Sequence, residues 1–303
     1  MLLKDIQRLI IGSANFGIDY GIANKNKRVS NDEVERIVEF TKRTGMFGID
    51  TASAYGISEE VLGKIGIEHL KVVSKIPAFS ADCVDFSRVG RSIVETSLEK
   101  LGIPKLHTVL LHCPEQLFSK VGSHIYSAML ELKNNNLTEL IGCSVYEVDE
   151  LERIQRDFDF DLYQIPYNIL DRRFLESGLI DRLVSKGIQV HARSVFLQGL
   201  LLMKKENRPH WMNRRDNGLD EWDEFVNKSG QSATNLCIDF AFKNPNLSGI
   251  VVGVDTLNQL LEIQKLLTSD RESPDFHPSF VDPLLCDPRL WASAEKNSGS
   301  EKP

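Results

Sequence analysis

Cysteine is scarce in this chain, and long apolar runs are missing. Five cysteines are spread over 303 residues with no two close together, which disfavours a disulfide framework or a CxxC metal site. No run approaches the ~20 apolar residues that span a bilayer. The first residues lack the long apolar segment and cleavage site of a signal peptide. We therefore expect a cytoplasmic protein that holds no metal and contacts no membrane.

Positive charge is also in short supply. The formal net charge of −7 disfavours a broad nucleic-acid footprint, so we expect no nucleic-acid partner. A small anionic ligand stays open, because local charge decides its binding. A G-x-G-x-x-G turn is absent as well, since Gly12, Gly17 and Gly21 are spread over a long loop. The bulk composition is that of an ordinary globular protein, with 42% hydrophobic and 26% charged residues.

Short β-rich runs alternate with longer stretches of helical periodicity, as repeated β–α units require. The expected strands are residues 9–13, 47–50, 71–75, 108–112, 139–143, 161–165, 188–192 and 249–253. The expected helices are residues 32–44, 58–65, 86–101, 119–134, 147–157, 176–186, 231–243 and 257–267. A capping box formed by Ser30 and Glu33, and the glycines Gly45, Gly102 and Gly187, support the helix ends.

Eight such pairs in one domain, residues 1–292, favour an α/β fold of the closed (β/α)8 TIM-barrel type. A doubly wound open sheet is the alternative, and the missing glycine signature disfavours it. Residues 203–225 interrupt the pattern with basic and aromatic side chains, either as a lid or binding loop or as a solvated insertion. The polar tail, residues 293–303, is expected to be disordered.

Four polar side chains stand at or just past the ends of predicted strands. Asp50 closes the second strand, Lys75 the third and His112 the fourth, and Tyr55 follows Asp50 by five residues. The C-terminal ends of parallel strands meet at one rim of a barrel, where barrel enzymes carry their catalytic residues. The sequence therefore predicts that these four side chains lie together.

The four side chains suit delivery of a proton to a carbonyl oxygen as hydride reaches the carbon, or the reverse oxidation. A nearby ammonium lowers the pKa of a phenol, so we expect Lys75 to acidify Tyr55 while Asp50 holds Lys75 charged. His112 would donate a hydrogen bond to the substrate oxygen or relay its proton. Taken singly, each residue has an ordinary structural explanation, and the adjacent Cys113 is expected to be a buried thiol rather than a nucleophile.

Several segments resemble the aldo-keto reductase family. Residues 48–56, Gly-Ile-Asp-Thr-Ala-Ser-Ala-Tyr-Gly, are similar to its signature. The other matching segments are Val73-Ser74-Lys75, Leu111-His112-Cys113-Pro114, Ile141-Gly142-Cys143-Ser144, residues 162–168 and Gln198-Gly199-Leu200-Leu201. They follow one another in the family's order over roughly residues 9–265. In its overall character the chain is similar to the branch of bacterial surface-polysaccharide pathways.

The resemblance implies a (β/α)8 barrel that binds NADPH or NADH and reduces a small-molecule carbonyl, in an aldehyde, a ketone or a sugar-type compound. It makes Tyr55 the general acid, Lys75 and Asp50 its tuning pair, and His112 the substrate-orienting group. The cofactor contacts that it implies are Asp50, then Ser144 and Gln164 at the carboxamide, Arg193 at the ring, Ser194, Phe196 and Leu197 at the pyrophosphate, and Gly253, Asp255, Thr256 and Gln259 at the adenosine end.

The chain departs from the family pattern in three places. Val145 stands where an asparagine is usual, which puts one carboxamide contact in question. Arg193 replaces a frequent aromatic residue, and its charge would disfavour oxidised nicotinamide. The basic residues for the 2′-phosphate of NADP are missing, and Val254, Asp255 and Gln259 stand in their region. Asp255 would repel a 2′-phosphate, so we expect discrimination against NADH to be weak or reversed.

Two other functions fit parts of the pattern. A regulatory barrel that senses the cofactor without turnover would not need to keep the proton donor Tyr55. A barrel lyase or isomerase would form a Schiff base on Lys75, which the neighbouring Asp50 disfavours. Basic residues of the 203–225 segment, together with Arg193, could recognise an anionic or nucleotide-linked substrate. Neither the substrate nor the oligomeric state is determined by the sequence.

Overall fold

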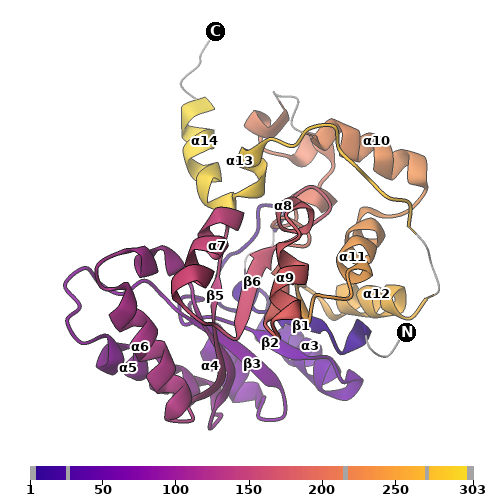
Figure 1. Ribbon diagram of the computed structural model, residues 1–303. Helices are drawn as coiled ribbons and strands as arrows, with labels where there is room; N and C mark the ends of the chain where they lie inside the picture. The colour runs from indigo at the N-terminus through magenta and orange to yellow at the C-terminus, as the bar shows by residue number, and fades with distance from the viewer. Residues whose placement is uncertain (1–4, 25–27, 214–217, 270–272, 299–303) are drawn as a thin grey trace.

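The computed structural model describes residues 5–24, 28–213, 218–269 and 273–298. Eight parallel strands follow one another around a closed barrel, and the last strand pairs with the first (Figure 1). The strands are β1 (Leu9–Gly12), β2 (Gly48–Asp50), β3 (Lys71–Ile76), β4 (Leu106–Leu111), β5 (Thr138–Ser144), β6 (Leu162–Pro166), β7 (Gln189–Arg193) and β8 (Gly249–Gly253). The predicted (β/α)8 barrel is therefore confirmed.

Helices surround the barrel (Figure 1). The helices are α2 (Ala14–Gly17), α3 (Asn31–Thr44), α4 (Ser58–Ile65), α5 (Phe86–Leu101), α6 (Gly122–Asn134), α7 (Val148–Asp157), α8 (Arg173–Glu176), α9 (Leu179–Ser185), α10 (Leu219–Ser229), α11 (Ala233–Lys243), α12 (Leu257–Leu267), α13 (Pro283–Cys286) and α14 (Trp291–Ser298). Short 3₁₀ helices are η1 (Pro114–Phe118), η2 (Leu200–Leu202), η3 (Lys205–Asn207), η4 (His210–Asn213) and η5 (Pro288–Leu290). The helix expected over 176–186 is divided into α8 and α9, because Gly178 between them adopts a left-handed φ of 66°.

Half of the expected capping box is formed at the start of α3. The Ser30 hydroxyl accepts a hydrogen bond from the Glu33 N–H at 3.4 Å. The reciprocal half is absent, because the Glu33 carboxylate accepts instead from the N–H of Leu257, the first residue of α12, at 2.5 Å. Glu33 therefore links two helices that lie far apart in the sequence.

The barrel interior sets the direction of the functional side chains. Val73, Leu162 and His191 are fully buried, and the ring of His191 meets Phe47 edge-to-face at 5.2 Å between centroids. Side chains alternate between the two faces of a strand, so the residues two positions further along also point inward, now at the C-terminal rim. Those residues are Lys75, Gln164 and Arg193.

The described residues of the segment 203–225, namely 203–213 and 218–225, are a packed part of the structure. Trp222 of α10 is fully buried and donates its indole N–H to the carbonyl of Leu201 at 3.0 Å. The buried guanidinium of Arg208 pairs with Asp223 at 2.8 Å. These contacts fix η3 and α10 to each other at one end of the barrel (Figure 1).

The basic residues of this segment were one candidate for binding an anion. Arg208 is paired as described, and Lys205 pairs with Asp220 at 2.6 Å. Arg214 and Arg215 lie outside the described residues. Arg208 and Lys205 thus already neutralise acidic residues of their own segment.

The polar tail differs from its expectation. Residues 293–298, expected to be disordered, form the greater part of α14, and residues 299–303 lie outside the described part of the chain. The helix is anchored at its first residue, because the indole of Trp291 is buried and donates to the carbonyl of Leu284 at 3.1 Å. In Figure 1, α13 and α14 lie at the same end of the barrel as α10.

Candidate active site

A buried ion pair lies at the centre of the rim. The Lys75 ammonium on β3 donates to the carboxylate of Asp50 on the neighbouring β2 and to the carbonyl of Thr51 at 2.9 Å. The two charged side chains are 2% and 5% exposed. Because each charge compensates the other away from water, removing one alone leaves the other unpaired.

Tyr55 and His112 complete the predicted group. The Lys75 nitrogen lies 5.1 Å from the centroid of the Tyr55 ring. The rings of Tyr55 and His112 lie 6.1 Å apart at an interplanar angle of 84°. Both rings are half-buried, so they remain open to a small ligand. The structure thus brings all four predicted side chains to one place at the barrel rim.

The pKa of Tyr55 differs from the expectation. Burial and the Asp50 carboxylate raise the pKa of the phenol above its ordinary value, whereas the Arg193 guanidinium lowers it in part. The predicted acidification by Lys75 is wrong for this structure, because Asp50 compensates the ammonium charge within the ion pair. Tyr55 therefore holds its proton at neutral pH.

His112 carries no charge at neutral pH. Burial and the nearby Lys75 ammonium lower the pKa of its imidazole to about 4. A neutral imidazole has one N–H donor and one acceptor nitrogen. His112 can therefore donate a hydrogen bond to a carbonyl oxygen without bringing a charge.

A chain of hydrogen bonds links four strands across the rim. The Gln164 amide donates to Asp50 at 2.7 Å, and the Ser144 hydroxyl donates to Gln164 at 3.3 Å. The Arg193 Nε–H then donates to the Ser144 hydroxyl at 3.3 Å. A hydroxyl and an amide are groups of the kind that pair with a carboxamide, and the contact of Ser144 and Gln164 with the cofactor stays a prediction.

The turn after β7 has an unusual backbone. Ser194, Leu197 and Gln198 have positive φ angles of 61°, 49° and 54° although none is glycine. In the part of the chain that the structure describes, the N–H groups of Val195, Phe196 and Gln198 have no acceptor. Adjacent free amides of this kind suit a phosphate group, so the turn fits its predicted contact with a pyrophosphate.

The predicted adenosine end lies where β8 leads into α12. Gly253 ends the strand, and a Cβ built there would meet nothing within 4 Å. Thr256 caps α12 by accepting from the Gln259 N–H at 3.2 Å, and Gln259 in turn accepts from the Asp255 N–H at 2.7 Å. These side chains form a small acidic turn in front of the helix.

Sequence reasoning missed two residues at this turn. Asn15 donates to the Asp255 carboxylate at 2.7 Å and to the Val254 carbonyl at 2.8 Å. Glu33 accepts from the Leu257 N–H, as described above. Both come from the other end of the chain, so no local pattern indicates these contacts. Barrel closure between β1 and β8 creates them.

Sequence reasoning also missed an aromatic residue beside Arg193. The guanidinium of Arg193 lies 4.0 Å from the centroid of the Tyr146 ring, and that of Arg289 lies 3.5 Å from the same centroid. Arg289 comes from η5 in the C-terminal segment, which thereby reaches the rim. Its side chain pairs with Asp287 at 2.7 Å.

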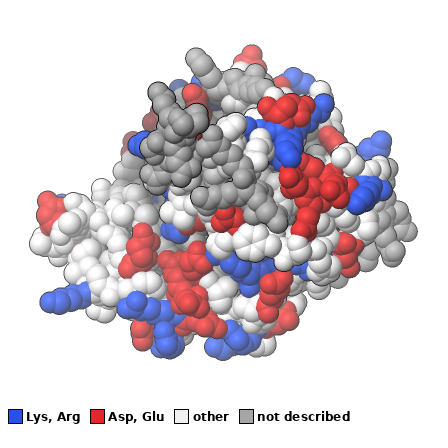
Figure 2. Space-filling model, turned by 90° about the horizontal axis from the view of Figure 1, so that it is seen from above, with Lys and Arg blue, Asp and Glu red and all other residues white. Residues whose placement is uncertain are grey.

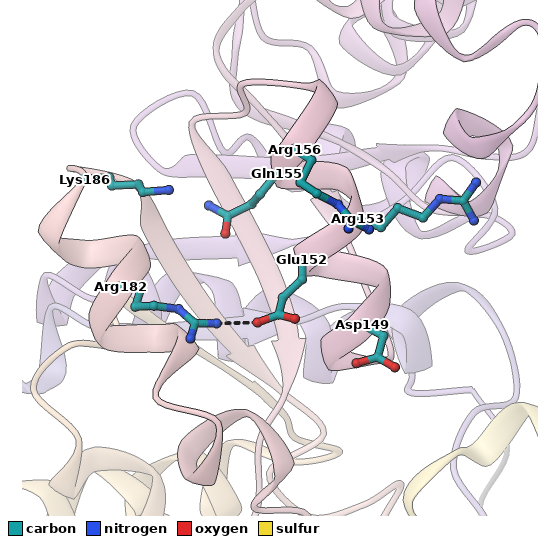
Figure 3. Close-up of a pocket in the computed structure, with 7 residues that line it drawn as sticks. All are labelled: Asp149, Glu152, Arg153, Gln155, Arg156, Arg182 and Lys186. Carbon is teal, nitrogen blue, oxygen red and sulfur yellow. Dashed lines mark hydrogen bonds and ion pairs between the residues drawn. The ribbon is translucent and has the colours of Figure 1, made fainter.

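A separate surface pocket lies outside the barrel between α7 and α9 (Figure 3). Charged side chains of both signs line it, and Glu152 and Arg182 form an ion pair across it. It contains none of the predicted site residues. Figure 2 looks onto the end of the molecule that carries α10 and α14, and shows acidic and basic side chains close together on its uncovered part.

The site gives less support to catalysis by a cysteine nucleophile or by a metal ion. Cys113 is half-buried, and burial raises the pKa of its thiol, which leaves it a poor nucleophile. Across the described ranges, no group of three or more His, Cys, Asp or Glu side chains could hold a metal ion. The same ranges contain no helix that is long and apolar enough to cross a membrane.

The fold and site together define a barrel oxidoreductase. A closed barrel carries a phenol, a neutral imidazole and a buried ion pair at its rim, beside groups suited to a carboxamide and a phosphate. The model of the aldo/keto reductase family matches residues 8–273, and the chain belongs to this family. It is thus an NAD(P)H-dependent oxidoreductase.

The sequence identity between this chain and individual relatives is low. The chain is 28% identical over 255 residues to L-galactose dehydrogenase of Arabidopsis thaliana, covering 77% of each chain. It is 24% identical over 265 residues to NADH-specific methylglyoxal reductase of Escherichia coli K12, covering 76% of this chain and 80% of the relative. An aldo-keto reductase of Bacillus halodurans, solved in its holo form, superposes with a TM-score of 0.70 at 17% identity and 88% coverage of both chains. The last likeness shows the fold alone.

Proposed function

We propose that this protein reduces the carbonyl group of a small aldehyde, ketone or sugar-type compound to an alcohol, with Tyr55 as the proton donor. The observation that supports this most strongly is the meeting of Tyr55, His112 and the buried Asp50–Lys75 pair at one rim. When bound, the reduced nicotinamide cofactor supplies hydride to the carbonyl carbon. The residues described here orient the substrate oxygen and deliver its proton.

The raised pKa of Tyr55 suits a proton donor in the reducing direction. A general acid must hold its proton until the acceptor becomes basic. A carbonyl oxygen becomes an alkoxide as the carbon is reduced, and an alkoxide is far more basic than a phenolate. The Arg193 guanidinium, whose charge lowers the pKa of Tyr55, then stabilises the phenolate that forms.

His112 has an orienting role in this proposal. Its imidazole is neutral because its pKa is lowered to about 4, and its ring stands edge-on to the Tyr55 ring. It therefore offers an N–H to the substrate oxygen beside the phenol. Two donors to one oxygen fix that oxygen in place before the proton moves.

NADH is the cofactor that the adenosine end favours. The carboxylates of Asp255 and Glu33 both lie at the start of α12, where a 2′-phosphate would bring further negative charge. Arg36, on the same helix as Glu33, is already paired with it at 2.8 Å. The relative from Escherichia coli K12 is named as NADH-specific. We therefore propose that NADH binds more tightly than NADPH.

Two measurements test this function. Isothermal calorimetry with NADH and NADPH separately should show binding of NADH, and more weakly of NADPH. Loss of nicotinamide absorbance with a panel of carbonyl compounds that includes methylglyoxal should then reveal turnover. A protein that binds neither cofactor, or binds NADH but reduces no member of a broad panel, would contradict the proposal.

A further inference from the structure

Arg193 differs from the other arginines near the rim. Within the described ranges, its guanidinium has no carboxylate at ion-pair distance. The other rim arginines are paired: Arg173 with Asp171, Arg208 with Asp223 and Arg289 with Asp287. The positive charge of Arg193 is therefore directly available to a ligand.

The hydrogen bonds of Arg193 leave two donors free. Its Nε–H donates to the Ser144 hydroxyl at 3.3 Å, Nη1 to the Ser194 hydroxyl at 3.1 Å and Nη2 to the Val145 carbonyl at 3.0 Å. All three acceptors are uncharged. A guanidinium has five N–H groups, so one N–H remains on each terminal nitrogen. Two such N–H groups are what a carboxylate or phosphate needs for a bidentate contact.

The guanidinium is also held in place before any ligand binds. It stacks on the Tyr146 ring at 4.0 Å, and the backbone N–H of Tyr146 donates to Glu150 at 2.8 Å. With three hydrogen bonds and one stacking contact, little side-chain freedom remains to be lost on binding. Preorganisation of this kind strengthens binding by lowering its entropic cost.

Arg193 lies close enough to the reacting groups for its charge to act on them. Its charge acts on both Tyr55 and His112, and lowers the pKa of each. The Asp50–Lys75 pair contributes no net charge there. Arg193 is thus the source of unbalanced positive charge beside Tyr55 among the contacts described.

We propose that Arg193 binds an anionic group, a carboxylate or a phosphate, on the carbonyl substrate; this rests on the proposed function. The substrate class is then a carbonyl compound that also carries a negative charge, such as an oxo acid or a phosphorylated sugar. The diphosphate of the cofactor has the same chemistry and could meet the same two N–H groups. The experiment separates these two sources.

The test compares 4-formylbenzoate with 4-formylbenzamide, which match in shape and differ in charge, and glyceraldehyde 3-phosphate with glyceraldehyde. The measured quantity is the ratio of kcat/KM for the anionic compound to kcat/KM for its neutral partner. General damage to catalysis cancels in this ratio. We expect wild type to favour the anionic member of at least one pair, and Arg193→Gln to lower that ratio by about tenfold or more. The ratio for Arg193→Lys should lie between the ratios for wild type and Arg193→Gln, since lysine keeps the charge and loses the planar guanidinium.

Arg289→Gln is the matched control. Arg289 contacts the same Tyr146 ring but is already held by Asp287, so this variant should change the ratio less than about threefold. Equal effects of the two variants would overturn the assignment to Arg193. Calorimetry with NADH completes the test. If Arg193→Gln bound NADH more weakly and left the ratio of kcat/KM values unchanged, the two free N–H groups of Arg193 would contact the cofactor, and the proposal would be overturned. Turnover of all compounds with no preference for charge would refute the inference alone, whereas no turnover at all would refute the proposed function.

Discussion

At the scale of the residue, the groups around Tyr55 determine the pKa of its phenol. Its phenol is half-buried, Asp50 is one of its charged neighbours, and its pKa is raised by both. The Lys75 nitrogen lies 5.1 Å from the ring centroid with its charge compensated by Asp50, whereas the Arg193 charge lowers the pKa of the same phenol. Arg193 therefore stabilises the phenolate during turnover and does not ionise Tyr55 beforehand.

This environment determines the pH dependence of the reaction. A raised pKa means that Tyr55 stays protonated above the pH at which an ordinary phenol, with a pKa of ~10, ionises. We predict that kcat/KM for reduction shows no loss through Tyr55 up to about pH 10. The reverse oxidation needs the phenolate, so its rate should rise with pH over the same range. A reduction profile that falls with an apparent pKa near neutrality would show that the phenol is far more acidic than its surroundings indicate.

The Asp50–Lys75 pair also has a consequence for stability. Lys75→Met removes the ammonium and leaves Asp50 buried without its cationic partner. We expect the free energy of unfolding to fall by ~3–5 kcal/mol, because a lone buried charge is costly. The double variant Asp50→Asn with Lys75→Met should recover much of that loss. Urea denaturation followed by circular dichroism measures wild type, the two single variants and the double variant, and additive losses in the double variant would argue against direct coupling.

At the scale of the element, most of the fold could be predicted from periodicity and end signals. All eight strands and one helix after each of them were expected, because an apolar run in a parallel barrel is bounded by polar turns. The additional helices α2, α8 and α10 were not. The described part of the insertion 203–225 could not be placed, since it is held by contacts between residues far apart in the chain, such as that of Trp222 with the Leu201 carbonyl. The helix in the polar tail could not be predicted for a similar reason, because the indole of Trp291 anchors it.

The contact between α3 and α12 leads to a prediction about the cofactor. Glu33→Gln keeps an acceptor for the Leu257 N–H, removes one negative charge and frees Arg36 from its pair. We expect NADPH to bind about tenfold more tightly, as removal of a nearby like charge allows. NADH affinity should change by less than about twofold, because its ribose carries no phosphate there.

Calorimetric dissociation constants for the two cofactors measure this effect. Glu35→Gln is the control, since it removes the same charge from an exposed position of the same helix. The assignment of Glu33 to cofactor choice fails if both variants shift NADPH binding equally, or if neither does.

At the scale of the whole molecule, closure of the barrel decides what the sequence can and cannot reveal. The meeting of Asp50, Lys75 and His112 could be predicted, because all three stand at successive strand ends. The approach of Arg289 to Tyr146 could not, because it depends on the path of the C-terminal segment over the rim. Contacts between segments far apart in the chain come from closure and from covering elements rather than from a local pattern.

The buried interior also makes the stability of the molecule depend on pH. Full burial lowers the pKa of His191 to about 3, against 6.5 in an exposed chain. The unfolded state therefore binds a proton first as the pH falls, and stability is lost progressively below about pH 6.5. We expect this group to contribute a slope of up to ~1.4 kcal/mol per pH unit. His191→Leu should flatten the measured dependence of unfolding free energy between pH 6.5 and 4, and parallel curves for the two proteins would exclude His191 as a source.

The most direct measurement concerns the proton donor. Tyr55→Phe removes one hydroxyl from the rim and leaves the Asp50–Lys75 pair and the turn after β7 intact. With NADH and a reducible aldehyde, we expect kcat to fall by ~10²–10⁴-fold, the usual contribution of a positioned acid, while the calorimetric affinity for NADH stays within about twofold. If Tyr55→Phe turned over at the wild-type rate with unchanged cofactor binding, the phenol would not be the source of the proton.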